Sequence, residues 1–468
     1  MTATNNNARW LLAAGLGTLA LWVYWPLFDL ALLGWDTWPM ILTARVQSWS
    51  DLWGCVSESL MDGRYPHGEF YRPVTNLLFA LDHALGGLEP SAYHRTDWLI
   101  HLTSTLLMAG LAARLCAGRH ALRVAAVAGV LFCLHPIQLE LITAPPRRAD
   151  TLCLLFTLAC LLTQPLRGMN RDVRSKCLGG LFAFLAVGSK ETGAVVLPVV
   201  LAWHLCFAQG PCTTLERLRR GARGTLPVVV GVVALVGVRS GVRGGGGGPV
   251  PLGAEPAGRL ELCGALIERA VLPLPLWGWS HPHLPLYAAG LLVFGAVKIS
   301  RSHRTAGSDE QDTPSVGSVL SFLGLWSLAV IAITGFADQM HEWYALLLTA
   351  PVVLIVARCL ISERADRSAA LGPWLLIFPL VSLVFLARGW PLESTPRPQA
   401  MSETKPNSVN PLNKEVLPGL TARICSARAD TPPASLITAA GAMIIAASIN
   451  MAWKASVHTT ARNPPTKV

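Results

Sequence analysis

Long apolar runs without charged residues recur along the chain, separated by short polar or basic segments. Several of these runs are about 17 to 22 residues long, the length that an α-helix needs to cross the ~30 Å hydrocarbon core of a bilayer. The spans of a membrane β-barrel would instead show alternating segments of about ten residues. The pattern therefore predicts an all-α, polytopic integral membrane protein with about twelve transmembrane helices, at residues 10–33, 94–115, 122–143, 150–166, 177–189, 192–208, 225–240, 284–299, 316–335, 343–360, 371–388 and 434–452.

Composition and charge agree with a membrane protein. The 468 residues are 52% hydrophobic and 14% charged, whereas soluble domains carry roughly 25% charged residues. The net charge is +10, but the basic residues cluster in short loops on one side of the predicted spans, as the positive-inside rule requires of cytoplasmic loops. We therefore expect both termini in the cytoplasm, and a lipid bilayer rather than nucleic acid as the partner. The short loops and bare N-terminus favour a bacterial inner membrane.

The polar segments divide the chain into regions. Residues 1–388 are predicted to form the transmembrane domain, with a polar and aromatic external loop at 34–93. A second external loop at 241–283 begins with a glycine run, which is typical of a flexible linker. The segment 389–433 is rich in Pro and Ser, and we expect it to be poorly ordered. Residues 434–468 are predicted to form the last span and a short basic cytoplasmic tail.

Unusual polar residues gather toward the external ends of the predicted spans. Ionisable groups at membrane depth are costly and usually face a cavity or one another. We therefore expect one external, partly buried polar cavity, lined by Asp36, Arg72, His135, Glu140, Arg147, Arg148, Asp150, Lys190 and Glu191. Arg147 and Arg148 stand out because they lie on the side where the positive-inside rule disfavours basic residues.

This set of residues suits transfer of a sugar from a lipid-linked phosphate. The donor phosphate gains charge as it leaves, so one or two Arg or Lys side chains should converge on it. The acceptor hydroxyl must lose a proton to a carboxylate within hydrogen-bond distance. We therefore expect Asp36 to be the general base, and Arg148, Arg147, Arg72 and Lys190 to supply the cations. The long apolar helices would supply a groove for a polyprenyl chain.

Four motifs in order carry a resemblance to a known family. They are YRP at Tyr71–Pro73; YH and a second His at Tyr93, His94 and His101; HP–E–RAD at His135, Pro136, Glu140 and Arg148–Asp150; and KE–P at Lys190, Glu191 and Pro198. Over about residues 20–208 the chain resembles the GT-C superfamily of membrane glycosyltransferases, in particular protein O-mannosyltransferases and the bacterial relatives of the transmembrane-TPR O-mannosyltransferases. The resemblance implies a GT-C-like fold. It also implies inverting transfer of a mannose-like hexose from a polyprenyl-phosphate donor to a protein or glycan acceptor on the external face.

Two departures from this family pattern change the expectation. The first loop of the family often carries two adjacent acids, whereas here Asp36 is followed by Thr37. A single carboxylate suffices as a base but is a poor site for a divalent metal, which takes several oxygen ligands. We therefore predict transfer without a metal or other cofactor. In addition, no TPR repeats follow the spans.

Each candidate residue also has a purely structural interpretation. Asp36 would then cap a helix at the membrane surface, and Arg147 would be an interfacial arginine. Arg148 would pair with Asp150 or Glu140, and Asp150 would be a structural partner or helix N-cap. Lys190 and Glu191 would form a salt bridge with each other. His135 would bond backbone groups left open by the kink at Pro136, and His94 and His101 would be packing residues on one helix face.

The whole chain has alternative interpretations as well. A transporter or lipid flippase would also have many spans and buried charges, but it predicts ionisable groups near the middle of the membrane and an inverted repeat. An inactive GT-C scaffold would fit the absence of the second acid beside Asp36.

Overall fold

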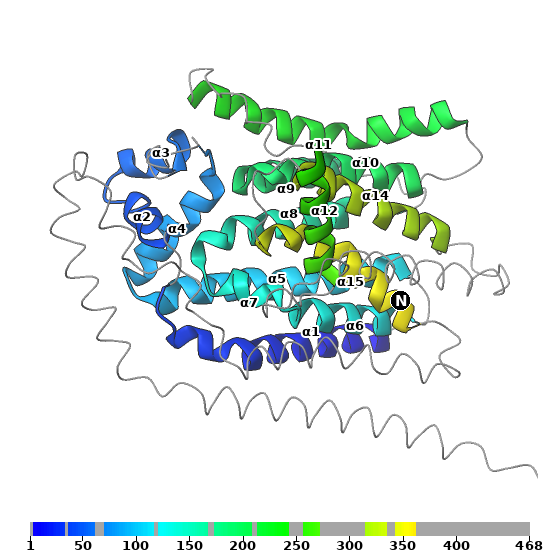
Figure 1. Ribbon diagram of the computed structural model, residues 1–468, viewed down its shortest axis with the longest axis horizontal. Coiled ribbons are helices and arrows are strands. Elements are labelled where there is room, and N and C mark those ends of the chain that lie inside the picture. The colour runs from blue at the N-terminus through cyan, green and yellow to red at the C-terminus, as the bar shows by residue number, and fades with distance from the viewer. Residues whose placement is uncertain are drawn as a thin grey trace, which may run out of the picture. The chain divides into compact units, whose positions relative to one another are not determined.

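The computed structural model describes residues 3–32, 36–60, 70–116, 120–166, 173–207, 213–242, 256–271, 314–334 and 342–361. Within these ranges every regular element is a helix (Figure 1). The α-helices are α1 (Ala3–Tyr24), α2 (Thr37–Thr43), α3 (Trp49–Ser57), α4 (Pro73–Gly86), α5 (Pro90–Cys116), α6 (Ala121–Cys133), α7 (Ile137–Ile142), α8 (Arg148–Thr163), α9 (Val173–Ser189), α10 (Val196–Phe207), α11 (Thr214–Val242), α12 (Pro256–Val271), α14 (Val316–Thr334) and α15 (Leu346–Leu360). Short 3-10 helices are η1 (Trp25–Asp29), η3 (Pro145–Arg147), η4 (Glu191–Val195) and η6 (Glu342–Ala345).

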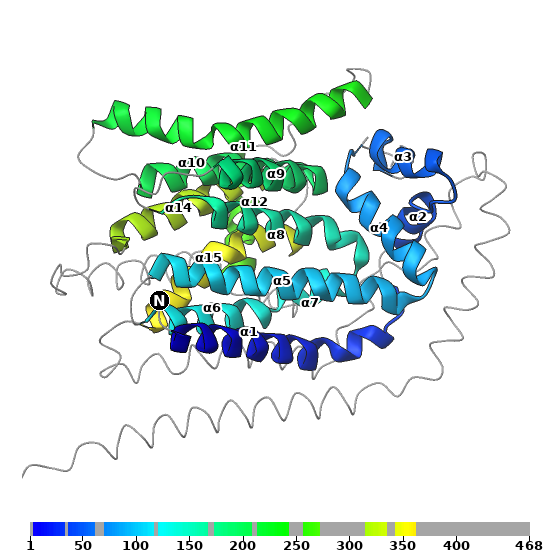
Figure 2. The same ribbon diagram turned by 180° about the vertical axis from the view of Figure 1, so that it is seen from behind.

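Five of the described helical segments are long and apolar enough to cross a membrane. They are Asn6–Asp29, Pro90–Cys116, Thr214–Gly241, Val316–Thr334 and Trp343–Leu360. The shorter apolar helices α6 and α10 pack among them, and the two views of the bundle show the long helices running side by side (Figures 1 and 2). These helices confirm an all-α integral membrane fold. The predicted spans at 284–299, 371–388 and 434–452, and the Pro/Ser-rich segment 389–433, lie outside the described residues.

The outer faces of the bundle carry exposed apolar side chains, as expected for contact with lipid tails. On α11, Val230 is 60% exposed and Val233 is 61% exposed. On α14, Leu328 is 61% exposed. Contiguous exposed apolar surface of this kind is rare in soluble proteins, so these faces agree with a bilayer around the helices.

The first predicted external loop folds into the short helices α2, α3 and α4, which gather at one end of the bundle (Figures 1 and 2). Ser48 begins α3 with a capping box, in which its hydroxyl accepts from the Asp51 N–H while the Asp51 carboxylate accepts from the Ser48 N–H. Gly87 follows α4 with a φ of 61°, a backbone conformation that favours glycine. A small core formed mainly by Met40, Ile41, Phe79 and Tyr93 joins α2 and α4 to the start of α5.

The YRP motif explains how this loop returns to the bundle. The Tyr71 hydroxyl donates to the Val56 carbonyl oxygen at 2.6 Å, which ties the end of α3 to the segment before α4. Arg72 reaches across to Glu191 at the start of η4. Pro73 occupies the first position of α4, where the missing N–H carries no penalty. Each residue of the motif therefore has its own structural role.

Proline breaks the predicted third span into two helices. The span was expected to run over 122–143, but α6 ends at Cys133 and α7 begins after Pro136. Proline lacks an N–H and clashes with the preceding turn, which favours a kink or a break in the helix. The buried pair Pro145 and Pro146 then forms η3, and α8 starts directly behind it. The result places Arg147 in a tight turn at the end of the bundle.

The predicted flexible loop at 241–283 contains an ordered element. Helix α12 lies within it and packs against α15 and η6. Its anchor is His135, whose fully buried ring bridges two backbone groups: Nδ1 accepts from the Ile137 N–H at 3.3 Å, and Nε2 lies 3.3 Å from the Ala270 carbonyl oxygen. An acceptor at Nδ1 leaves the proton on Nε2 to donate to Ala270. The glycine run itself lies outside the described residues.

Helices α9 and α11 approach closely because glycines face each other. A Cβ atom on Gly231 would overlap the Gly180 carbonyl oxygen, and one on Gly180 would lie 2.7 Å from the Pro227 oxygen. Small residues allow this close packing of helices in membranes.

Gly231→Ala should therefore lower the stability of the protein. The extra methyl group forces α9 and α11 apart, and overpacking of this kind costs about 1–3 kcal/mol. Gly237→Ala is the matched control, because a Cβ on Gly237 meets nothing within 4 Å on the same helix. Thermal melts followed by tryptophan fluorescence should show a lower midpoint for G231A alone. Equal midpoints for the two variants would contradict the close packing.

Candidate active site

Asp36 lies at the start of α2 with its carboxylate uncommitted to the helix. It occupies the N-cap position, but its side chain makes no capping hydrogen bond. The residue is half-buried, and α2 packs against η3, which carries Arg147. The sequence suggested either a base or a helix cap, and the side-chain geometry does not support the capping role. A carboxylate in this position can accept a proton from a ligand.

Arg147 lies on η3, against which α2 packs, and its guanidinium contacts an aromatic ring. Its guanidinium carbon lies 3.1 Å from the ring centroid of Trp343, at the start of the α15 segment. Burial lowers the pKa of Arg147, and the nearby carboxylates of Asp150, Glu140 and Asp36 oppose that effect. Among the described residues no carboxylate is within ion-pair distance of this guanidinium. Arg147 is therefore a cation that can receive an anionic ligand.

Lys190 and Asp150 form a nearly buried ion pair beside Arg147. The Lys190 Nζ lies 2.6 Å from the Asp150 Oδ1, and it is 5.0 Å from the ring centroid of Tyr344. Burial lowers the pKa of the Lys190 ammonium, and Asp150 opposes that change. Asp150 is thus a partner of Lys190, where the sequence suggested an internal pair between Lys190 and Glu191.

Glu191 pairs instead with Arg72 of the YRP motif. Both the Nε and Nη2 of Arg72 donate to the Glu191 Oε2, at 3.2 and 2.9 Å. Burial alone would lower the pKa of Arg72, but Glu191 and Asp150 raise it above its usual value. The pair is partly exposed, and it joins the first loop to η4 at the same end of the bundle as Lys190.

Arg148 points away from this cluster and into the protein interior. Its side chain is 0% exposed, and it forms ion pairs with Asp82 at 2.6 Å and Asp97 at 2.7 Å. It also donates to the Tyr93 carbonyl oxygen and lies over the Phe79 ring. The structural interpretation of Arg148 expected Asp150 or Glu140 as its partner, and neither is. With no exposed surface, this guanidinium has no face left for a phosphate in this conformation.

The structure therefore brings most of the predicted residues together in one cluster and places Arg148 and His135 elsewhere. The cluster at the end of the bundle comprises Asp36, Arg72, Glu140, Arg147, Asp150, Lys190 and Glu191. Arg148 lies in a buried triad, and His135 anchors α12. The histidines His94 and His101 are also buried; the ring of His101 packs between Tyr24 and Phe132.

Sequence reasoning missed four residues that shape this region. Asp82 and Asp97 hold Arg148, and Trp343 and Tyr344 lie against the two cations. Asp82 had a readable signal, because it follows a mainly apolar stretch of α4, where an acid requires a partner. Nothing local in the sequence connects Trp343 with Arg147.

A metal site is not apparent in the described part of the chain. No group of three or more His, Cys, Asp or Glu side chains there is arranged to hold an ion. The independence of the reaction from metal stays a prediction.

Comparison with known proteins places this site in context. No protein-family model matches the chain. The chain is 27% identical over 186 residues to the human protein O-mannosyl-transferase TMTC3, a match that covers 38% of this chain and 19% of TMTC3. It is 32% identical over 156 residues to human protein O-mannosyl-transferase TMTC2, covering 32% of this chain and 18% of TMTC2. The chain thus matches less than a fifth of the length of these relatives.

The fold has a counterpart among solved structures. ArnT from Cupriavidus metallidurans, solved with bound undecaprenyl phosphate, superposes with a TM-score of 0.51. The match covers 83% of this chain and 66% of ArnT, at 14% sequence identity. The predicted resemblance is thereby confirmed: this chain is an integral membrane protein with the GT-C fold, and it is similar in sequence to protein O-mannosyl-transferases.

Proposed function

We propose that this protein is an inverting membrane glycosyltransferase. It moves a hexose, mannose-like by analogy with the TMTC relatives, from a polyprenyl-phosphate donor to a hydroxyl of a protein or glycan on the external face of the membrane. The protein would lie in a bacterial inner membrane with both termini in the cytoplasm. ArnT was solved with undecaprenyl phosphate, which supports a polyprenyl-phosphate carrier here.

One observation carries this proposal. Helix α2, which begins after the uncapped carboxylate Asp36, packs against η3, whose Arg147 has no ion-pair partner among the described residues, although the two segments are more than a hundred residues apart in the chain. Transfer of a glycosyl group from a phosphate needs one base for the acceptor and one cation for the leaving group.

The reaction follows from these two groups. Asp36 accepts the proton of the acceptor hydroxyl while the oxygen attacks the anomeric carbon of the donor sugar. The bond between that carbon and the phosphate oxygen breaks, and the electron pair stays on the phosphate. A single displacement of this kind inverts the anomeric configuration. The lipid phosphate then leaves with an added negative charge.

Arg147 is the residue we assign to that phosphate, in place of Arg148. Arg147 is half-buried and has no ion-pair partner among the described residues, whereas Arg148 is enclosed by two carboxylates. Lys190 and Arg72 add positive charge at the same end of the bundle, although Asp150 and Glu191 partly neutralise them. We propose that His135 supports the site from outside it by holding α12, and that Glu140 tunes Arg147 through its charge.

Arg147→Gln should weaken donor binding without loss of the fold. A hydrogen bond to a charged group contributes about 1.5–3 kcal/mol, so the affinity for a polyprenyl-phosphate sugar should fall by roughly ten- to hundredfold. Binding of a radiolabelled polyprenyl-phosphate mannose to the purified protein measures this effect. Arg95→Gln is the matched control, because Arg95 is exposed at the start of α5. Equal binding by both variants would remove Arg147 from the donor site.

The activity itself is tested by reconstitution. Vesicles containing the purified protein and labelled polyprenyl-phosphate mannose should transfer the label to acceptor peptides or to glycans from the host envelope. Mass spectrometry of surface glycans and glycopeptides in deletion and complemented strains identifies the acceptor. Movement of the sugar lipid across vesicles without transfer would instead favour a flippase, and neither movement nor transfer would favour an inactive scaffold.

A further inference from the structure

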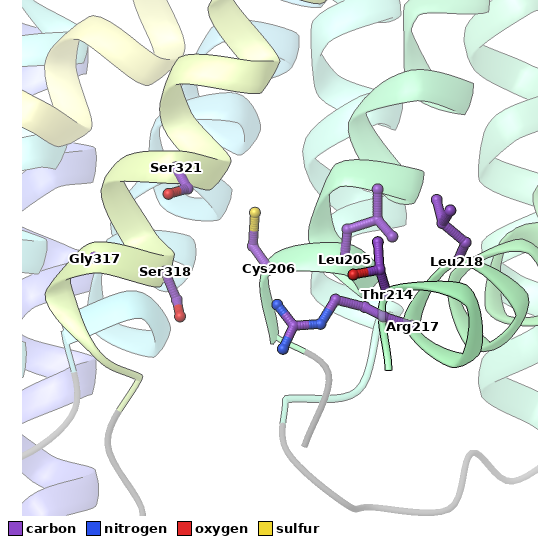
Figure 3. Close-up of a pocket in the computed structure, with 8 residues that line it drawn as sticks. All are labelled: Leu205, Cys206, Thr214, Arg217, Leu218, Gly317, Ser318 and Ser321. Carbon is purple, nitrogen blue, oxygen red and sulfur yellow. The ribbon is translucent and has the colours of Figure 1, made fainter. Parts of the chain in front are cut away.

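A pocket of about 420 Å³ with a mixed polar and apolar lining lies at the end of the bundle opposite the candidate active site, and its lining residues are drawn in Figure 3. Lys190 lies just before the segment that leads into α10, whereas the pocket begins near the other end of α10, at Leu205 and Cys206. The remaining lining residues come from the first turns of α11 and α14: Thr214, Arg217, Leu218, Gly317, Ser318 and Ser321. This pocket is therefore separate from the proposed site of transfer.

The polar lining of the pocket is complementary to an anion. The Arg217 side chain extends from α11 toward Cys206 and into the space that faces Ser318 (Figure 3). Hydroxyls of Thr214, Ser318 and Ser321 complete the polar side, and none of the described residues that line the pocket is a carboxylate. The neighbouring acid, Glu216, is held away by a hydrogen bond from the Thr213 N–H to its Oε2 at 3.0 Å.

The pocket has open space and an apolar side. A Cβ atom on Gly317 would meet nothing within 4 Å, so the first turn of α14 leaves room for a ligand. Leu205 and Leu218 line the pocket, and further along α14 Leu325 and Leu328 are exposed. A ligand with an anionic head and an apolar chain would therefore find partners for both parts.

We propose that this pocket binds the phosphate group of a phospholipid or of a free phosphate, with Arg217 as the charged contact. A guanidinium with surrounding hydroxyls is a favourable arrangement for phosphate oxygens. The pocket lies at one end of three apolar helices, and α11 carries further arginines in the same turns, at the level where lipid head groups gather. Under the predicted topology this level is the cytoplasmic leaflet. The inference is independent of the glycosyltransferase proposal.

Native mass spectrometry of the full chain in detergent tests the site. Dioleoyl phosphatidylglycerol is titrated onto the wild-type protein and onto Arg217→Gln, and bound lipid is counted per protein. We expect about tenfold weaker binding for R217Q, the effect of losing one charge-assisted contact. Ser321→Leu, which fills the pocket at an exposed position, should also weaken binding. Arg219→Gln removes the same charge from the same helix outside the pocket and should bind as wild type.

Competition with inorganic phosphate distinguishes a phospholipid ligand from free phosphate. If millimolar inorganic phosphate displaces the lipid, the site also takes the free anion; if it does not, the lipid chain contributes to binding. Retention of inorganic phosphate alone, lost in R217Q, would assign the site to the free anion. Equal lipid binding by R217Q and R219Q, or unchanged binding by S321L, would overturn the proposal. Melting midpoints near that of wild type for all variants confirm that binding rather than folding is compared.

Discussion

Asp36→Asn should abolish hexose transfer while the protein remains folded and still binds its donor. Asparagine has nearly the shape of aspartate but cannot accept the acceptor proton, and a positioned general base contributes about 10²–10⁴-fold to rate. The Asp36 side chain makes no capping hydrogen bond, so the start of α2 does not depend on its charge. The nearby Arg147 guanidinium retains the carboxylates of Glu140 and Asp150 in its surroundings.

The measurement is transfer of labelled hexose from a polyprenyl-phosphate donor by reconstituted vesicles, together with donor binding and a thermal melt. Asp29→Asn provides the control, because Asp29 is an exposed carboxylate seven positions earlier, at the end of η1. Wild-type transfer by D36N would exclude Asp36 as the base. If Glu140→Gln then abolished transfer, the base would lie on α7 instead.

The sequence predicted the helical membrane architecture well because hydropathy reports directly on contact with lipid. A helix such as α14 meets the bilayer along one face and the bundle along the other, and both environments are apolar. Pro136 predicted a kink, but the span was expected to continue to residue 143, whereas α6 ends at Cys133. The sequence predicted α12 less well, because the position of this helix depends on a contact between His135 and Ala270, two residues that are 135 positions apart in the chain.

The candidate site was predicted as a set of residues but not as a set of partners. Arg147 and Arg148 are adjacent, and composition cannot tell which of them turns inward. The turn at Pro145 and the start of α8 decide this, because successive helix positions face different directions. The structural interpretation also misjudged the pairing, because it joined Lys190 to Glu191. Lys190 instead pairs with Asp150, 40 positions away, and Glu191 pairs with Arg72, 119 positions away.

Arg148→Met should destabilise the whole first loop and, through it, the candidate site. The change leaves Asp82 and Asp97 buried without their cation, and breaking a buried ion pair costs about 3–5 kcal/mol. These residues join α4, α5 and α8, so the loss would detach the helices that hold Asp36 and the YRP motif. Asp82→Asn should have a milder effect. Burial raises the pKa of Asp82 in the folded protein even beside Arg148. The ionisation of Asp82 therefore opposes folding, and this cost grows as the pH rises above the ordinary pKa of an aspartate side chain.

The triple variant Asp82→Leu, Asp97→Leu, Arg148→Met separates structure from chemistry. Replacing a whole buried ionic cluster by well-packed hydrophobic side chains of similar volume is often neutral or stabilising, so the triple variant should melt near the wild-type temperature. Because Arg148 has no exposed surface, the triple variant should also bind donor and transfer hexose. Size-exclusion profiles, melting midpoints and transfer rates of the single and triple variants measure this directly. If R148M kept full stability but lost donor binding, or the triple variant were stable yet inactive, Arg148 would be a phosphate ligand, reached through a conformation in which the triad opens.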